Sequence, residues 1–144
     1  MRGISAKLRI GLITILLAGC ASAPGAIPVE ERLAPCPDSP NCVSSYAQDD
    51  VHAIEPLPMP ADQDATGALR RIVESFPRTT IVTVDGDYLH ATFASRIFRF
   101  VDDVEFLVDR DAGVVHVRSA SRVGYGDMGV NRRRVEEIRS LLTD

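Results

Sequence analysis

The sequence predicts an α+β domain: an antiparallel meander sheet of about four strands, with two helices packed on one face of it. Apolar residues recur at helical spacing in two segments, one over residues 62–76 and one after residue 131. Between these segments lie four short runs rich in β-branched and aromatic residues, separated by turn signals. Strands joined by such short turns pair with their neighbours in the sequence, which predicts the meander.

The first helix is expected over residues 62–76. Asp62 or Asp64 can cap its amino end. Pro77 is expected to end it, because a proline disfavours the helical conformation in the residue before it. One face of this helix carries Leu69, Ile72, Val73 and Phe76.

The strands are expected at residues 79–84, 88–93, 97–109 and 114–119, with turns at 85–87 and 109–113. Successive side chains of a strand point to opposite faces. The face toward the helices is expected to hold Leu89, Phe93, Phe98, Phe100, Phe106, Val108, Val115 and Val117. The opposite, solvated face is expected to hold Tyr88, His90, Thr92, Glu105, His116 and Arg118.

Asp102 falls on the apolar side of its strand by strict alternation. Either a bulge re-aims it, or it is a buried carboxylate with an arginine partner. The last helix follows a glycine-rich loop, and Asn131 is expected to cap it. The apolar face of this helix holds Val135, Ile138 and Leu142.

Residues 1–19 are predicted to be a lipoprotein signal peptide. Three basic residues precede an apolar run at residues 10–17, which is shorter than the roughly 20 residues that a transmembrane helix needs. The small residues before Cys20 resemble a lipoprotein box, so Cys20 is expected to carry lipid; an ordinary cleaved signal is the alternative. Residues 20–35 then form a tether and residues 36–144 one domain. These features predict a bacterial envelope protein that faces the periplasm, held by its lipid anchor in the outer membrane.

The predicted signal peptide holds three of the 16 basic residues and none of the 20 acidic ones, so the remainder has 13 basic residues, 20 acidic ones and a net charge of −7. An acidic protein of this kind is not expected to bind nucleic acid, since phosphate contact needs a positive face. All 13 remaining basic residues are arginines. Arginine suits bidentate pairing with carboxylate or phosphate.

Cys36 and Cys42 are the two cysteines left in an oxidising compartment, which predicts a disulfide. Closing this short loop stabilises the fold by about 2 kcal/mol in the chain-entropy model. A zinc site and a catalytic cysteine are the alternatives, but the spacing is not that of a zinc finger and no Cys/His pair follows.

Several motifs occur in a fixed order along the chain. They are Cys36-Pro37-Asp38-Ser39-Pro40-Asn41-Cys42-Val43-Ser44-Ser45, Phe100–Phe106, Arg118–Gly124 and Asp127-x-Gly129-x-Asn131-Arg132. Together they resemble the domain of unknown function 1499 family over residues 36–142. The resemblance implies a role in the cell envelope and brings no established reaction.

The region from Val114 to Arg134 is the candidate site. Its arginine forks, hydroxyl groups and glycines could bind an anion near the positive end of the last helix. The alternative is structural: Arg118 or Arg122 pairs internally with Asp102, Asp103 or Asp127. The residues predicted to bind the ligand are Arg118, Ser119, Ser121, Arg122, Asp127, Asn131 and Arg132.

Other chemistries have weaker support. A hydrolase could use Ser119 or Ser121 with His116 and Asp127, but no Gly-x-Ser-x-Gly elbow is present. Acid–base catalysis could draw on the carboxylates of residues 102–105. Two histidines without a third ligand do not predict a metal site, and the glycines do not form a dinucleotide fingerprint, so no cofactor is expected.

The sequence therefore favours a lipid-anchored envelope protein that binds an anionic small molecule or an envelope component. A hydrolase that uses the loop from Arg118 to Asn131 is the first alternative. A structural envelope protein that acts through protein contacts is the second. Whether the chain is an enzyme stays open.

Overall fold

The computed structural model describes residues 33–62 and 64–143. The predicted signal peptide (residues 1–19), the lipidation site Cys20 and the tether up to residue 32 lie outside the described residues. Within the described ranges, no helix is long and apolar enough to cross a bilayer.

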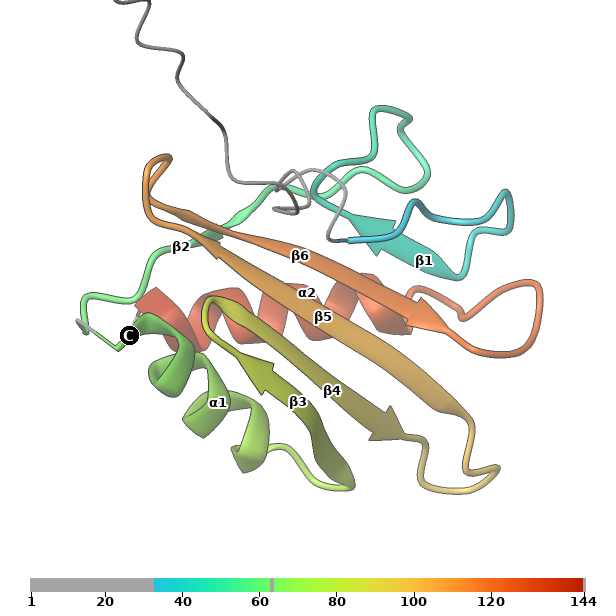
Figure 1. The fold of residues 1–144 in the computed structure, drawn as a ribbon. Coiled ribbons are helices and arrows are strands. Elements are labelled where there is room, and N and C mark those ends of the chain that lie inside the picture. Colours follow the sequence, from blue (N-terminus) through green and yellow to red (C-terminus); the bar gives the residue numbers. More distant parts are fainter. Residues whose placement is uncertain (1–32, 63, 144) are drawn as a thin grey trace, which may run out of the picture.

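The sheet is antiparallel and has the strand order β1-β6-β5-β4-β3, with β2 also pairing with β6 (Figure 1). The long strands β3 (Thr79–Asp85), β4 (Tyr88–Ala94), β5 (Val101–Asp109) and β6 (Val114–Ser121) form the meander. Short strands β1 (Cys42–Ser44) and β2 (Leu57–Pro58) pair with the outer edge of β6. The α+β class and the antiparallel sheet are confirmed; the expectation of about four strands is wrong, because the sheet has six.

The two missed strands give little sequence signal. Strand β1 has three residues and begins at the second cysteine of the loop, and β2 has two residues, the second of which is a proline. A proline lacks the N–H that a strand donates, so it is confined to edges and bulges. Alternation cannot be recognised over so few residues.

Helix α1 (Ala65–Ser75) begins and ends close to the predicted positions. The Asp64 side chain accepts a hydrogen bond from the backbone N–H of Gly67 at 2.9 Å, and is therefore the cap. Phe76 is already extended, as expected for a residue that precedes proline.

Helix α2 (Val130–Thr143) begins differently from the prediction. Asn131 lies inside the helix and does not cap it. The Asp127 carboxylate accepts hydrogen bonds from the N–H groups of Gly129 (2.9 Å) and Asn131 (2.8 Å). Asp127 is therefore the capping residue, and the Asn131 side chain is free to point inward.

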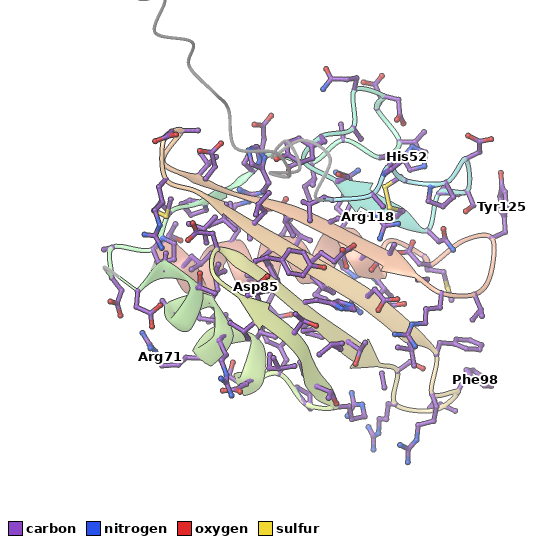
Figure 2. The ribbon with its side chains drawn as sticks, viewed as in Figure 1. His52, Arg71, Asp85, Phe98, Arg118 and Tyr125 are labelled. Carbon is purple, nitrogen blue, oxygen red and sulfur yellow. A yellow bond between two sulfur atoms is a disulfide. The ribbon has the colours of Figure 1, made fainter. Side chains whose placement is uncertain are left out.

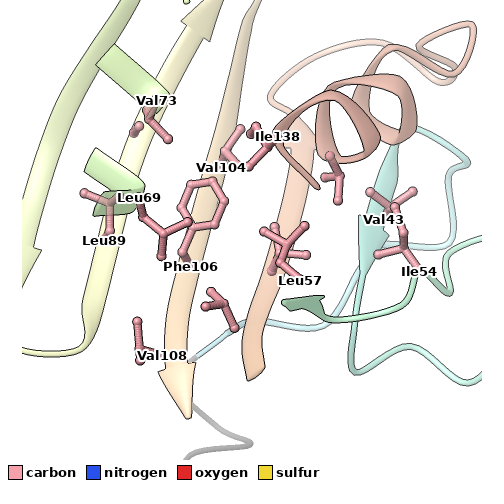
Figure 3. Close-up of a cluster of buried hydrophobic side chains, with 14 of the residues drawn as sticks. Val43, Ile54, Leu57, Leu69, Val73, Leu89, Val104, Phe106, Val108 and Ile138 are labelled. Atoms are coloured by element: carbon pink, nitrogen blue, oxygen red, sulfur yellow. The ribbon is translucent and has the colours of Figure 1, made fainter. Parts of the chain in front are cut away.

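The hydrophobic core joins both helices to the sheet (Figure 3). Leu69 and Val73 of α1 and Val135 and Ile138 of α2 are fully buried in the same cluster as the inward residues of β4, β5 and β6. Fully burying one such side chain contributes roughly 1.5–3 kcal/mol. The amino-terminal segment extends this core with Val43, Ile54 and Leu57.

Phe98 and Phe100 were expected in this core, and that expectation is wrong. Their side chains are 73% and 53% exposed, and the two rings stack on each other at 5.5 Å. Strand β5 begins only at Val101, because residues 95–100 form a loop in which the N–H of Ser95 donates to the carbonyl of Phe100 at 2.8 Å. The alternation of apolar residues continued through the loop and wrongly extended the predicted strand.

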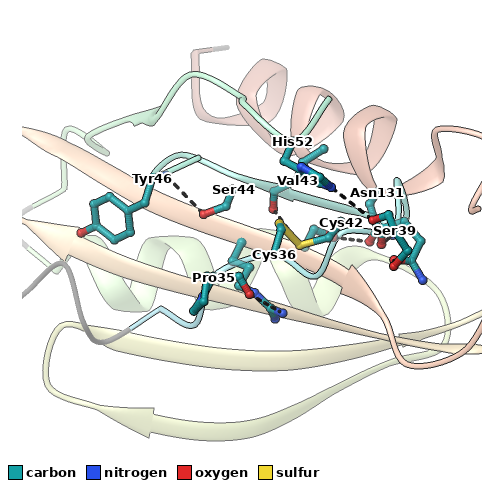
Figure 4. The surroundings of a disulfide bond; sticks show 12 residues. Pro35, Cys36, Ser39, Cys42, Val43, Ser44, Tyr46, His52 and Asn131 are labelled. Carbon is teal, nitrogen blue, oxygen red and sulfur yellow. Dashed lines mark hydrogen bonds between the residues drawn. A yellow bond between two sulfur atoms is a disulfide. The ribbon is translucent and has the colours of Figure 1, made fainter. Parts of the chain in front are cut away.

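Cys36 and Cys42 form the predicted disulfide, with their Cα atoms 5.7 Å apart. It closes the loop that precedes β1 and lies against the outer edge of β6 (Figure 4).

Candidate functional site

The seven predicted ligand residues do not all meet at one site, because strand alternation divides those of β6 between the two faces of the sheet. Arg118 of β6 points to the polar face, where it contacts Glu105. Ser119, the next residue, points to the helix side and is completely buried. Asn131 of α2 is also completely buried, and it accepts a hydrogen bond from the Ser119 hydroxyl at 2.5 Å.

A buried polar cluster surrounds Asn131. Its side-chain amide donates to the carbonyl of Asn41 (3.1 Å), to the hydroxyl of Ser121 (3.0 Å) and to the carboxylate of Asp127 (2.8 Å). Asn131 thereby joins α2 to β6, to the cysteine loop and to the β6–α2 loop. This contact pattern is that of a structural residue, since the whole side chain is engaged within the protein.

Asp102 is a buried carboxylate with an arginine partner, the second of the two alternatives drawn from the sequence. The pairing of β5 continues through Asp102 without a register shift. Its partner is Arg134 of α2, whose Nη2 lies 2.6 Å from Oδ2 of Asp102, with both side chains close to 10% exposed. Arg134 also donates to Ser119 and Asn131 and lies over the ring of Phe93. The ion pair therefore belongs to the interior.

Arg132 contacts backbone atoms. Its guanidinium donates to the carbonyl of Ala53 at 2.8 Å and to that of Val51 at 3.0 Å. Arg139, two turns further along α2, does the same with Glu55 and Pro56. Together these arginines hold the segment before β2 against the last helix.

The polar face of the sheet carries two cross-strand networks. Arg118 lies 3.1 Å from Glu105, which accepts the Tyr88 hydroxyl at 2.8 Å. Arg122 makes a bidentate contact with Asp103, at 2.8 and 2.9 Å. His90 contacts the same carboxylate at 2.8 Å. Arginine and carboxylate charges balance in both networks, so this face offers an incoming anion little uncompensated positive charge.

Burial and hydrogen bonds change the titration of this face. Burial raises the pKa of Tyr88, and its hydrogen bond to Glu105 raises it further. Arg122, and to a smaller extent His90, hold the pKa of Asp103 below its ordinary value of 3.8. Burial alone would raise the pKa of Asp127, but hydrogen bonds from the N–H groups of Asn131 and Gly129 lower it overall.

The carboxylates of Asp103 and Asp127 make the folded state less stable in acid. Their pKa values in the folded state lie below the ordinary value of 3.8, so the unfolded chain binds more protons near that pH. We expect their stabilising effect to be complete above about pH 5 and to be lost as the pH falls below 3.8 through the folded pKa values. Denaturant titrations at pH 7 and pH 3 measure this. Asp103→Asn should flatten the pH dependence, and an unchanged dependence in that variant would contradict the assignment.

The hydrolase grouping of Ser119 or Ser121 with His116 and Asp127 is not assembled. His116 lies on the polar face, where its Nδ1 is 3.2 Å from Oγ of Ser45 and its Nε2 is 3.6 Å from a carboxylate oxygen of Asp109. The Ser45 hydroxyl also accepts the N–H of Val117 at 3.0 Å. An oxyanion hole beside Ser45 would need free backbone N–H groups. The N–H groups of residues 45–47 all donate to acceptors within the protein, so they do not form one.

An open depression of about 410 Å³ lies beside the disulfide. His52 at its edge contacts the Asp49 carboxylate through Nδ1 at 2.8 Å and the carbonyl of Ser39 through Nε2 at 3.2 Å. Both ring nitrogens thus hold the surrounding loops together. In the described ranges, no group of three or more His, Cys, Asp or Glu side chains could hold a metal ion.

Exposed apolar side chains gather at one end of the domain. We call this region the loop end: residues 95–100, between β4 and β5, and residues 122–130, between β6 and the first turn of α2. The two loops are adjacent because Asp102 pairs with Ser121 and the N–H of Arg122 donates to the carbonyl of Val101 at 3.0 Å. Figure 2 shows Phe98 and Tyr125 pointing outward from this end. The large apolar side chains of the loop end are 39% to 92% exposed: Ile97, Phe98, Phe100, Val123, Tyr125, Met128 and Val130.

Arginines flank these apolar side chains. Arg96 and Arg99 belong to the β4–β5 loop, and Arg78 lies beside it, donating from Nε to the carbonyl of Ala94 at 3.1 Å. Within the described ranges, none of the three has a carboxylate within ion-pair distance. Residues 88–101 contain no Asp or Glu. The loop end is therefore basic and apolar on a chain that is acidic as a whole.

The backbone of the loop end is also unusual. The non-glycine residues of positive φ in the described chain are Arg78, Arg99 and Met128, at 59°, 55° and 54°. A residue with a side chain is disfavoured there by about 1–2 kcal/mol. All three lie in or beside the loop end.

Sequence reasoning placed the candidate site at Val114–Arg134, which contains residues 122–130 of the loop end, and missed residues 95–100. The run Arg96-Ile97-Phe98-Arg99-Phe100 alternates like a strand, so its aromatic residues were assigned to the core. The available signal was the pair of arginines in a stretch that lacks acids.

These features define a small disulfide-bonded α+β domain whose polar clusters are mostly internal and whose exposed apolar residues lie at one end. Residues 32–142 match the family described as Protein of unknown function (DUF1499), and the chain belongs to that family. No curated protein matches the chain. Family membership confirms the resemblance seen in the motifs and assigns no reaction.

Proposed function

We propose that this protein is a lipid-anchored binding module of the bacterial cell envelope, with the loop end as its working surface and an anionic envelope component as its partner. One observation carries the proposal. Of the eleven large hydrophobic side chains that are exposed in the described ranges, seven lie at the loop end. Scattered exposed apolar residues need no explanation, but a concentration of them marks an interaction surface.

Charge supports an anionic partner. Arg78, Arg96 and Arg99 lack carboxylate partners in the described part of the chain, whereas Arg118 and Arg122 are each neutralised by a carboxylate on the polar face. An anion is therefore attracted more strongly to Arg78, Arg96 and Arg99 than to Arg118 and Arg122 of the predicted ligand cluster. The ligand role of that cluster stays a prediction, and its contacts favour the structural alternative.

The sequence supports the envelope location. The basic and apolar start of the chain, followed by Leu17-Ala18-Gly19-Cys20, has the layout of a lipoprotein signal. A lipid on Cys20 would hold the domain near a membrane. The disulfide is also typical of an oxidising compartment.

The test is site-specific photocrosslinking in cells. A benzophenone amino acid replaces Phe98 in one variant and Tyr125 in another; the control variant carries it at Ala112, an exposed residue of the β5–β6 turn at the opposite end of the sheet. We expect a defined adduct from positions 98 and 125 and none from position 112. Equal labelling at the three positions, or none at 98 and 125, would overturn the proposal.

The mass of the adduct distinguishes partners. An adduct of low mass identifies a lipid, glycan or other small envelope component. An adduct with a protein would support the alternative of a structural envelope protein that acts through protein contacts, and would overturn the anionic partner if the protein's contact surface is not acidic.

A further inference from the structure

We infer that the partner of the loop end is the anionic surface of a lipid bilayer, and that the domain lies on the membrane with this end inserted among the headgroups. The inference rests on the proposed function and names its partner. Four observations carry it: the kind of exposed side chain, the position of the arginines, the charge of the rest of the chain, and the length of the tether.

The exposed side chains are those that stabilise a protein at a bilayer surface. Phe98 and Ile97 project from the tip of one loop, and Tyr125 and Met128 from the other, with exposed fractions between 73% and 92%. Apolar groups of this size enter the boundary between headgroups and acyl chains. A tyrosine ring suits the interface because its body is apolar and its hydroxyl remains hydrated.

The arginines lie where lipid phosphates would be. Arg96 and Arg99 flank Ile97 and Phe98 in the sequence, so insertion of the apolar tip brings both guanidinium groups to the headgroup level. A basic residue close to an anionic membrane contributes about a factor of five in affinity, corresponding to about 1 kcal/mol. Arg78 adds a third positive charge beside the same loop.

The charge of the remaining surface orients the domain. The chain after the predicted signal peptide has a net charge of −7, so most of its surface is repelled by anionic lipid. In the described ranges, the loop end combines exposed apolar side chains with arginines that have no carboxylate partner. Attraction there and repulsion elsewhere select one orientation.

The tether permits that orientation. Residues 20–32 number thirteen and span at most about 45 Å when extended. A domain of about 110 residues has a radius of gyration of about 13 Å. A lipid on Cys20 therefore lets any face of the domain reach the bilayer, and the surface itself decides which face does.

The experiment uses the absence of tryptophan from the chain. The full-length protein is incorporated into phosphatidylglycerol-containing vesicles with a single tryptophan at position 98, 125 or 112, introduced as Phe98→Trp, Tyr125→Trp or Ala112→Trp. Brominated acyl chains quench tryptophan on contact. We expect quenching at positions 98 and 125 to exceed that at position 112 several-fold, with a blue shift of their emission.

Charge is tested in the same system. Vesicles of phosphatidylcholine alone, or the double substitution Arg96→Gln/Arg99→Gln in the Phe98→Trp protein, should reduce quenching at position 98. Loss of two basic residues near an anionic surface corresponds to a docking equilibrium about 30-fold less favourable. The matched control is Arg110→Gln at the opposite end, whose arginine pairs with Asp87. It should leave the quenching unchanged.

The outcomes separate this inference from the proposed function. No preferential quenching at 98 and 125 would overturn the bilayer as partner. If these positions nevertheless crosslink to a non-lipid component in cells, the binding function stands with a different partner. Absence of both quenching and crosslinking would overturn both. Quenching that is insensitive to lipid charge and to both arginines would overturn the anionic part of the inference.

Discussion

Replacing Asp102 with alanine is expected to lower the free energy of unfolding by about 3–5 kcal/mol, the usual cost of leaving one member of a buried ion pair without its partner. Arg134 is 11% exposed, and its guanidinium is the buried positive charge that Asp102 balances. In the variant, the guanidinium would retain its hydrogen bonds to Ser119 and Asn131 but lose the only carboxylate within 4.0 Å in the described ranges. Its desolvation would then be uncompensated.

Asp103→Ala is the matched control for this substitution. Asp103 is the next residue of the same strand and also pairs with an arginine, but its partner Arg122 is 52% exposed on the polar face. Exposed pairs contribute about 0–1 kcal/mol, so this variant should lose far less stability. Urea denaturation of both variants at pH 7, with the disulfide intact, measures the difference. Comparable losses in the two variants would contradict the assignment of Asp102–Arg134 as an interior pair.

The alternation of side chains along strand β6 explains why the predicted ligand cluster at Val114–Arg134 is mostly scaffold. Arg118 and Ser119 are neighbours in the chain but point to opposite faces of the sheet. Ser119 meets α2, whereas Arg118 meets Glu105 on the next strand. A run of polar residues in a strand is therefore divided between two faces of the sheet. The number of polar residues in the run does not tell how many of them lie at one site.

Most of the meander could be predicted because its signals are local. The Asp85-Gly86-Asp87 turn contains a glycine at a φ of 57°, and Gly113 closes the next turn at 68°, as the turn chemistry requires. The strands that flank these turns alternate clearly, and Leu89, Phe106 and Val117 are all fully buried as expected. Helix α1 followed from its cap and from Pro77.

The remaining features depend on contacts between distant parts of the chain. Strand β1 forms because β6 offers an edge, and β6 lies more than 70 residues further along the chain. The sequence offers Arg118 and Arg122 as partners of Asp102, yet the partner is Arg134, which only the packing of α2 brings near. Asn131 was expected to be a cap by residue type, but the cap position was already occupied by Asp127. No local pattern specifies these choices.

The loop end shows the opposite error, in which a local pattern was followed too far. Phe98 and Phe100 lie at the spacing of a strand, and a positive φ of 55° at Arg99 breaks that strand. Apolar residues that remain exposed beside such a break gain nothing from the core. Their exposure therefore indicates a binding surface, whereas the buried polar cluster indicates a structural role.

Asn131→Ala is expected to lower the free energy of unfolding by about 3 kcal/mol. Asn131 is fully buried, and its amide donates to Asn41, Ser121 and Asp127 while its oxygen accepts from Ser119 and Arg134. Removal of the amide takes away the acceptor of the Ser119 hydroxyl and one acceptor of Arg134, at about 1–3 kcal/mol for each group left unsatisfied where water cannot reach it. The carbonyl of Asn41 keeps the N–H of Ser121 as a donor at 3.0 Å, so the main loss is at the buried Ser119 hydroxyl.

Ser121→Ala is the control for Asn131→Ala, since the Ser121 side chain is half-buried and makes one of these bonds. It should cost about 1 kcal/mol or less. The comparison also tests the ligand-binding role that the sequence predicts for Asn131 against the scaffold role that its contacts indicate. A ligand-binding asparagine would leave the melting temperature of the free protein nearly unchanged on substitution by alanine. A large fall in the Asn131 variant and a small one in the Ser121 variant would assign Asn131 to the scaffold and leave the loop end as the surface where binding should be sought.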